Sequence, residues 1–160
     1  MYSIGDKVVH PKHGAGRIAD IIRRLDDSHE EVLYYVFEMT VCSMRVIIPV
    51  NSADTIGIRP IFSKDKIVSL LADVSSEEIE QDANWNKRFR ENMDKVKSGD
   101  LTQVGSVIKA LTLRDRDRGL STGERKLLHA AKQIFASELE LAAGISYEEA
   151  ETMVDQAICA

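Results

Sequence analysis

The stretch IGIRPIFSKDKIVSLL, residues 56–71, decides the fold because the pattern of apolar residues changes within it. Its beginning, Ile56-Gly57-Ile58, fits a last short strand, and Pro60 marks a boundary. Beyond the proline, Ser63 can cap a helix whose apolar residues recur at helical spacing, namely Ile67, Leu70 and Leu71. A β half followed by a helical half predicts an α+β protein. The expected domains are residues 1–59 and 60–160.

Upstream of this boundary, the chain is typical of several short strands joined by turns. Pro11, Gly14 and Gly16 demand a turn, and Asp26-Asp27-Ser28 predicts a hairpin. Two strands are expected after that hairpin, at residues 32–39 and 43–50, the second ending near Pro49. Short strands at this spacing predict a small β-barrel of the SH3 or Tudor type.

Both faces of these strands carry apolar side chains. Leu33, Tyr35, Phe37 and Met39 share one face of their strand, whereas Val32, Tyr34 and Val36 share the other. A small barrel has only one interior, so part of the second apolar face has to be covered by something else. Either the second domain or a partner protein, paired at an exposed strand edge, can cover it.

Downstream of Pro60, the spacing predicts about five helices. Ser-x-x-Glu capping boxes predict three helix starts, at Ser75, Ser121 and Ser146. Ser98-Gly99-Asp100 separates two further helices, and glycines at 119 and 144 end helices.

Composition narrows the class of protein. An apolar fraction of 44% allows a real core, and no apolar run is long enough to span a bilayer. The N-terminus has no signal-peptide pattern, and Cys42 and Cys159 are typical of reduced thiols, so we expect a cytoplasmic protein without membrane association. A net charge of −5 argues against a sequence-blind nucleic-acid coat but allows a local basic patch.

The only tryptophan, Trp85, lies in the basic helical segment NWNKRFR, residues 84–90. It begins an apolar stripe at helical spacing, which favours a core role because aromatic residues mostly pack. Its place near the helix start and its cationic neighbours favour a different role, an apolar wedge in a distorted minor groove. The neighbouring cations are Lys87, Arg88 and Arg90.

Two other groups of basic residues can be either ordinary solvent-exposed side chains or functional ones. Arg125 and Lys126 stand in the first turn of an expected helix, where the dipole favours anions, so they suit an external phosphate as well as ordinary surface. Arg114, Arg116 and Arg118 alternate with aspartates, which is typical of a solvated helix end.

The sequence offers little for metal binding or catalysis. His10 and His13 form one His-x-x-His pair, with Cys42 on a later strand, and a zinc site needs three or four ligands. No phosphate loop, nucleophile elbow or cysteine with a nearby base is present. We therefore expect no metal, no cofactor and no enzymatic activity.

Ordered motifs cover essentially the whole chain. The first half carries Gly5-Asp6-Lys7-Val8-Val9, Pro11, His13-Gly14, Pro49 and Gly57-Ile58-Arg59. The second half carries Asn84-Trp85 with Arg88, Ser98-Gly99-Asp100, Arg114-Asp115, and Arg118-Gly119-Leu120-Ser121 followed by Gly123-Glu124. Together they resemble the CarD family of bacterial transcription regulators.

The resemblance implies a Tudor-like domain that docks on the β subunit of RNA polymerase. It also implies a helical domain that contacts double-stranded promoter DNA at the upstream edge of the transcription bubble. Trp85 occupies the position of a tryptophan that wedges into the minor groove. Arg88, Arg90 and Arg125 match basic positions along the DNA backbone, to which we add Lys87 and Lys126.

The polymerase-binding residues that the resemblance implies are Arg24, Arg45, Ile47 and Pro49. Arg24 matches a basic docking residue. Ile47 stands where well-known members carry an arginine that contacts polymerase. Arg45 lies two residues earlier on the same strand face and can substitute for it, so docking is expected to be weaker or more apolar.

We therefore expect a two-domain factor that stabilises the open promoter complex, bound to polymerase as a monomer and able to pair two copies through an edge strand. The alternative is a protein-protein adaptor on RNA polymerase that never touches DNA. The adaptor hypothesis predicts that Trp85 is buried and that Arg88 and Arg90 are paired with local acids.

Overall fold

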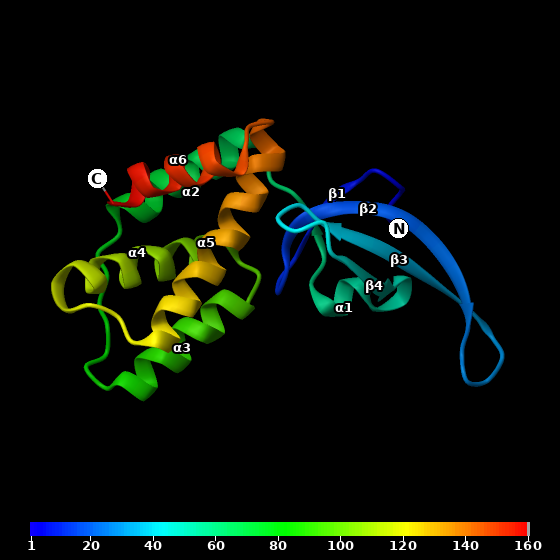
Figure 1. Cartoon of the computed structure of the whole chain (residues 1–160), viewed down its shortest axis with the longest axis horizontal. Helices are drawn as coiled ribbons and strands as arrows, with labels where there is room; N and C mark the ends of the chain where they lie inside the picture. The colour runs from blue at the N-terminus through cyan, green and yellow to red at the C-terminus, as the bar shows by residue number, and fades with distance from the viewer. Residues whose placement is uncertain (160) are drawn as a thin grey trace.

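The computed structural model describes residues 1–159, without the side chain of Cys159, and Ala160 lies outside it. A curved antiparallel sheet precedes a group of helices (Figure 1). The sheet contains β1 (Lys7–His10), β2 (Gly14–Leu25), β3 (Glu31–Met39), β4 (Arg45–Pro49) and β5 (Arg59–Pro60). The helices are α1 (Ala53–Ile56), α2 (Lys64–Ser76), α3 (Trp85–Lys97), α4 (Leu101–Arg118), α5 (Thr122–Ala143) and α6 (Tyr147–Cys159).

The sheet has the strand order β4-β3-β2-β1-β5. The turn between β2 and β3 is held by the Asp26 carboxylate, which accepts hydrogen bonds from the backbone N–H groups of Ser28 and Glu30, each at 2.9 Å. The edge strands β4 and β5 do not pair within residues 1–159, so the expected barrel is not closed. The fold class is otherwise confirmed, with a Tudor-like sheet followed by a helical part.

The expected strand at residues 56–58 is wrong. Residues 53–56 form the short helix α1 instead, and the last strand begins at Arg59. Gly57 ends α1 with φ +98°, a left-handed conformation that favours glycine, and its N–H bonds back to the Ala53 carbonyl. The apolar residues around Gly57 therefore belong to a helix end, and the division into domains 1–59 and 60–160 stays a prediction.

Within residues 1–159, five helices follow β5, as expected. Asp100 and Ser121 cap α4 and α5, and glycines 119 and 144 end them. The predicted helix start at Ser75 is wrong, because Ser75 lies in the last turn of α2 next to the fully buried Val74. Packing of Val74 extends α2 through this serine, and α3 is capped by Asn84 instead.

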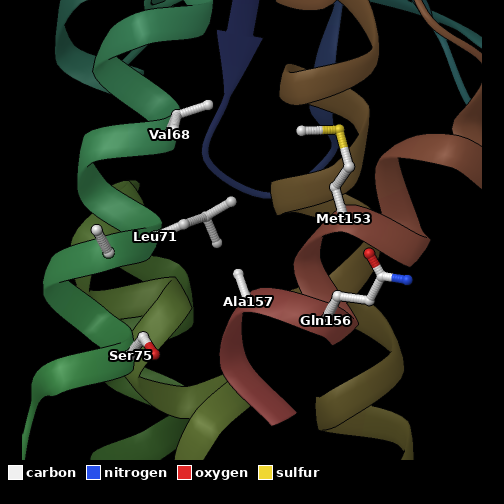
Figure 2. Close-up of a pocket in the computed structure, with 7 residues that line it drawn as sticks. Val68, Leu71, Ser75, Met153, Gln156 and Ala157 are labelled. Carbon is white, nitrogen blue, oxygen red and sulfur yellow. The ribbon is translucent and has the colours of Figure 1, made fainter. Parts of the chain in front are cut away.

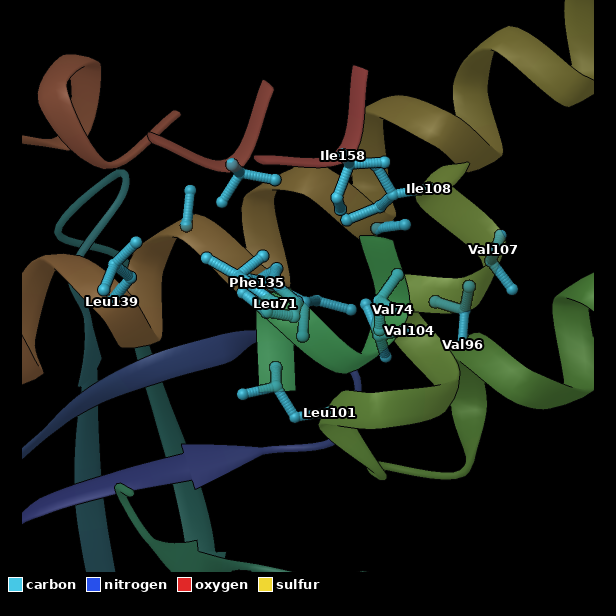
Figure 3. Close-up of a cluster of buried hydrophobic side chains, with 14 of the residues drawn as sticks. Leu71, Val74, Val96, Leu101, Val104, Val107, Ile108, Phe135, Leu139 and Ile158 are labelled. Atoms are coloured by element: carbon cyan, nitrogen blue, oxygen red, sulfur yellow. The ribbon is translucent and has the colours of Figure 1, made fainter. Parts of the chain in front are cut away.

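The helical core is built around Phe135 of α5, which is fully buried (Figure 3). A Cβ atom on Gly105 of α4 would lie 3.3 Å from its ring and 3.0 Å from Val74, so a glycine there lets α4 approach α5 and α2 closely. Between α2 and α6 lies an apolar groove of about 470 Å³, whose lining contains no charged residue (Figure 2). These contacts make the five helices one packed unit.

The sheet and the helices meet where α5 crosses the start of β2. There the Ala15 N–H donates to the buried Ser137 hydroxyl at 2.9 Å, and that hydroxyl donates to the Ile134 carbonyl at 2.9 Å. Gly14 precedes this contact with φ +79°. The backbone of β2 thus lies directly against α5.

Within residues 1–159, no helix packs on the second apolar face of the sheet, although Val36 on that face is only 9% exposed. Val36 pairs with Ile47, and Tyr34 pairs with Ile22 on one side and Pro49 on the other, so these side chains share that face. Ile47 remains 39% exposed. The helical part contacts the opposite end of β2 instead (Figure 1).

Replacing Gly14 with alanine is expected to destabilise the fold by roughly 1–3 kcal/mol beyond the strain of a positive φ. The new Cβ would lie 2.7 Å from the Ser137 hydroxyl and 3.2 Å from the Ile134 Cα. Gly5→Ala is the matched control, because φ is +93° there and nothing lies within 4 Å. Urea unfolding followed by circular dichroism gives both free energies, and equal losses would contradict the steric explanation.

Candidate functional site

Trp85 is the first residue of α3, and the Asn84 side chain caps the helix by accepting the Lys87 N–H at 3.1 Å. Its ring stacks on Phe89, with centroids 5.0 Å apart and planes at 8°. The side chain is nevertheless 43% exposed. Trp85 is therefore anchored to the core through Phe89 while it still presents an aromatic surface to solvent.

The polar edge of the indole is turned into the protein. Its N–H lies 3.2 Å from an oxygen of Glu124 and 3.3 Å from the Ser121 hydroxyl, both at the start of α5. Because the N–H is already satisfied, the part of the ring that remains accessible acts as an apolar surface.

Glu124 joins three helices although it is only 3% exposed. It completes the capping box with Ser121, and its second oxygen lies 3.5 Å from Nε of Arg88 on α3 and 3.6 Å from Nε of Arg114 on α4. Burial, the largest single influence, raises the pKa of Glu124. The hydrogen bonds from Ser121 and Trp85 and the charge of Arg88 together outweigh it, so the pKa is lowered. Glu124 is thus a buried, ionised carboxylate beneath Trp85.

Arg88 does not occupy the place that the sequence suggested. The residue is 2% exposed, and its guanidinium donates to the Asp82 carbonyl at 3.1 Å and faces Glu124. A guanidinium buried in this way cannot lie along a DNA backbone, so the expected phosphate contact needs correcting. Spacing alone missed this, because Arg88 lies one helical turn from Trp85, on the inward side, and its partner belongs to another helix.

The remaining predicted cations are exposed, and Lys87 and Arg90 follow Trp85 on α3 but project from a different side of that helix. Lys87 forms an exposed ion pair with Asp82 at 3.1 Å, which raises the pKa of the lysine. Arg125 donates to the Leu120 carbonyl at 3.3 Å, and Arg125 and Lys126 lie in the α5 turn whose Glu124 touches the indole. Arg90 is exposed and has no ion-pair partner among residues 1–159. We call Trp85, Lys87, Arg90, Arg125 and Lys126 the tryptophan corner.

The four predicted polymerase-binding residues share the open face of the sheet. Val36 pairs with Ile47, and Tyr34 with Pro49, while Arg24 pairs with Val32 on the projecting part of the hairpin. Arg45 lies opposite Glu38 and forms an exposed ion pair with it at 2.9 Å. The partner Glu38 was not expected from the sequence, and it neutralises part of the charge that Arg45 could offer to a partner. We call Ile22, Tyr34, Val36, Ile47 and Pro49 the outer sheet face.

The two histidines of the His-x-x-His pair pack against each other in their turn. The rings of His10 and His13 are 4.5 Å apart, and Nδ1 of His10 accepts the Lys12 N–H at 3.0 Å. Burial, followed by the charges of His13 and Lys12, lowers the pKa of His10 to about 4. In the part of the chain that the structure describes, no three His, Cys, Asp or Glu side chains are grouped to hold a metal ion.

Comparison with known proteins now decides the family. The CarD-like/TRCF RID domain family matches residues 2–62, and the CarD C-terminal domain family matches residues 66–155. The chain belongs to the CarD family. This CarD-family chain is 30% identical to "Putative transcription factor YdeB" of Bacillus subtilis (strain 168) over 149 residues, which cover 93% of this chain and 97% of that protein.

The resemblance inferred from the ordered motifs is therefore confirmed. CarD-type proteins act in transcription regulation and interact with RNA polymerase. The family is not an enzyme class. Within residues 1–159, no helix is both long and apolar enough to cross a membrane.

Replacing Glu124 with glutamine is expected to cost about 3–5 kcal/mol of unfolding free energy near pH 7, because the buried guanidinium of Arg88 and the partly exposed one of Arg114 lose their counter-charge. The pKa of Glu124 is lowered in the folded state. Its ionised carboxylate therefore stabilises the fold above the unfolded-state pKa, and this stabilisation is lost as pH falls through the folded-state pKa. The difference in unfolding free energy between wild type and Glu124→Gln should accordingly decrease below about pH 4.5.

Urea unfolding at several pH values measures this free-energy difference. The fluorescence of Trp85, the only tryptophan, reports the protonation of Glu124 independently. Glu80→Gln, an exposed carboxylate, is the control and should change the free energy by less than about 0.5 kcal/mol. A difference that stays constant with pH would show that Glu124 is not ionised in the folded protein.

Proposed function

We propose that this CarD-family chain binds the β subunit of RNA polymerase through its outer sheet face and contacts promoter DNA through its tryptophan corner. Trp85 then stabilises the open complex at the upstream edge of the bubble. The observation that carries this proposal is the half-exposed ring of Trp85, backed by Phe89 and with its N–H already satisfied by Glu124.

The geometry suits a wedge against an unstacked base step. Such a wedge needs an apolar surface that does not yield when a base packs against it, and the stacked Phe89 supports the ring from behind. Lys87, Arg90, Arg125 and Lys126 provide exposed cations for the flanking phosphates. Arg88 contributes indirectly, because it neutralises the carboxylate that orients the indole.

The tether to polymerase explains how an acidic protein can act on DNA. With a net charge of −5, the chain gains little from electrostatic attraction to DNA on its own. Docking on polymerase converts DNA contact into an intramolecular step at high effective concentration, so a few cations suffice. If the factor binds only the open promoter complex, it shifts the equilibrium between closed and open complexes by the difference between its affinities for the two.

The outer sheet face supports an apolar mode of docking. Ile47 replaces a cation with an exposed apolar side chain, and Tyr34 and Val36 lie beside it, while Arg24 and Arg45 lie toward its borders. A partner that covered this face would remove Ile47 from water, which favours association. One copy binds polymerase as a monomer in this proposal, because the edge strand β4 then faces the partner instead of a second copy.

The adaptor hypothesis keeps one supporting observation. Arg88 is paired with Glu124, as that hypothesis expected, and the acidic net charge agrees with it. Its other expectations fail, because Trp85 is 43% exposed and Arg90 has no acidic partner among residues 1–159. The DNA-contacting function therefore accounts for more of the geometry.

Trp85→Ala is expected to shorten the lifetime of the open promoter complex by roughly 5- to 150-fold relative to the wild-type factor, the equivalent of about 1–3 kcal/mol of base stacking. Binding to polymerase should not change. The measurement uses holoenzyme on a ribosomal-type promoter, with and without the factor. Val68→Ala is the control, because Val68 is also an exposed apolar residue, at 42%, but lies on α2. An unchanged lifetime with normal polymerase binding would favour the adaptor.

Ile47→Asp is expected to weaken binding to RNA polymerase by at least tenfold, because a charge would replace apolar surface in the proposed contact. Ile56→Asp is a matched control, since Ile56 is 38% exposed but lies on α1, which packs on the inner side of the sheet. Titration of labelled polymerase with each variant gives the dissociation constants. Equal weakening by both variants would place docking elsewhere.

A further inference from the structure

At the end of α5 that meets the sheet, the carboxylate of Glu138 accepts three hydrogen bonds. Glu138 is fully buried, and its two oxygens accept two hydrogen bonds from the Arg59 guanidinium, at 2.8 and 2.9 Å. One of these oxygens also accepts the backbone N–H of Phe62 at 2.8 Å. Arg59 belongs to β5 and Phe62 to the segment between β5 and α2, so one side chain of α5 grips the chain where the sheet passes into the helices.

Neighbouring contacts fasten the same end of α5. Ser137 accepts the Ala15 N–H from β2, and Lys7 of β1 reaches the Leu141 carbonyl at 3.4 Å. The Arg59 guanidinium also lies over the Phe62 ring at 4.1 Å. Strands β1, β2 and β5 are therefore all bonded to less than two turns of α5. We call the bonds among Glu138, Arg59 and Phe62 the α5 clamp.

The opposite end of α5 holds Arg125 and Lys126 and contacts Trp85 of α3 through Glu124. Glu124 and Glu138 are 14 positions apart on one helix, which corresponds to about 21 Å. α5 runs from beside α3 to the sheet (Figure 1). Since an α-helix is stiff over this length, the contacts between this end of α5 and the sheet, the clamp among them, set the distance and the angle between Trp85 and the sheet.

The clamp also satisfies a fully buried charge. A buried carboxylate is stable only while its charge and lone pairs are satisfied, and a bidentate guanidinium with one further N–H satisfies them. Replacing the carboxylate with an amide would point an N–H₂ group at the guanidinium and leave the Arg59 charge uncompensated. The clamp adjoins the helical core, because Phe62 packs against that core and the core residues Phe135 and Leu139 lie close to Glu138 on α5.

We propose that Glu138 is a positioning residue, whose clamp holds the sheet and α5 as one rigid body so that polymerase docking delivers Trp85 to a single place on the DNA. This inference rests on the function proposed above. Without the clamp, the helical part stays tethered to polymerase, but Trp85 samples many positions and its effective concentration at one base step falls.

The test compares Glu138→Gln with wild type in the full chain, using holoenzyme and promoter DNA. The variant is expected to bind polymerase as wild type does, because the outer sheet face is unchanged. Its lengthening of the open-complex lifetime should fall to roughly a tenth or less, since breaking a buried ion pair shifts the local equilibrium by about two orders of magnitude. Glu140→Gln is the matched control: it changes a half-buried carboxylate of α5 whose Oε2 accepts no hydrogen bond in the described part of the chain.

A second readout reports geometry directly and does not depend on DNA. Spin labels on the exposed Cys42 and on Thr152→Cys, in a Cys159→Ser background, measure distances between the sheet and α6. Wild type and Glu140→Gln should give one narrow distribution, and Glu138→Gln a broad one. Arg59→Lys, which keeps the charge but loses the bidentate geometry, should fall between them.

Several results would overturn the proposal. A narrow distribution in Glu138→Gln would show that the clamp does not set the geometry, and a broad one with normal open-complex lifetime would show that fixed geometry is not needed. Loss of polymerase binding in both Glu138→Gln and Arg59→Lys would assign the clamp to the stability of the sheet itself. If Trp85→Ala has no effect on lifetime, the proposed function fails, while the distance measurement still decides the clamp.

Discussion

Two carboxylates that folding removes from water determine how this molecule is put together. A buried carboxylate has to find cations or N–H donors, and both Glu124 and Glu138 lie on α5. Glu124 forms ion pairs with Arg88 of α3 and Arg114 of α4 at the start of α5. Glu138 forms an ion pair with Arg59 of β5 near the end of α5. The satisfaction of these two charges connects α5 to α3 and α4 at one end and to the sheet at the other.

The two interpretations of Trp85 turn out not to exclude each other. The ring packs on Phe89, as a core residue does, and it keeps a large exposed surface, as a wedge requires. The link between them is Glu124, which takes the indole N–H and so leaves the outward part of the ring apolar. Anchoring the aromatic from behind is what allows an exposed ring to be rigid.

The sheet shows the same division of labour between its faces. One face packs Tyr35, Phe37 and Ile48 into a core closed by α1. The other face carries Tyr34, Val36 and Ile47 and receives no cover from the helices, which join the sheet at the start of β2. An apolar face that its own chain leaves open is typical of a protein that docks on a partner.

The sequence by itself determined the features that depend on neighbouring residues. The change of period at Pro60, the hairpin at Asp26, the helix break at Ser98-Gly99-Asp100, the cap at Ser121 and the alternation of the strand faces follow from local conformation and hydrogen bonding. Only the tertiary structure decided which elements meet. Burial of Arg88, continuation of α2 through Ser75, helix α1 in place of a strand, the open barrel and the Glu138 clamp all depend on partners distant in sequence, whose identity spacing cannot reveal.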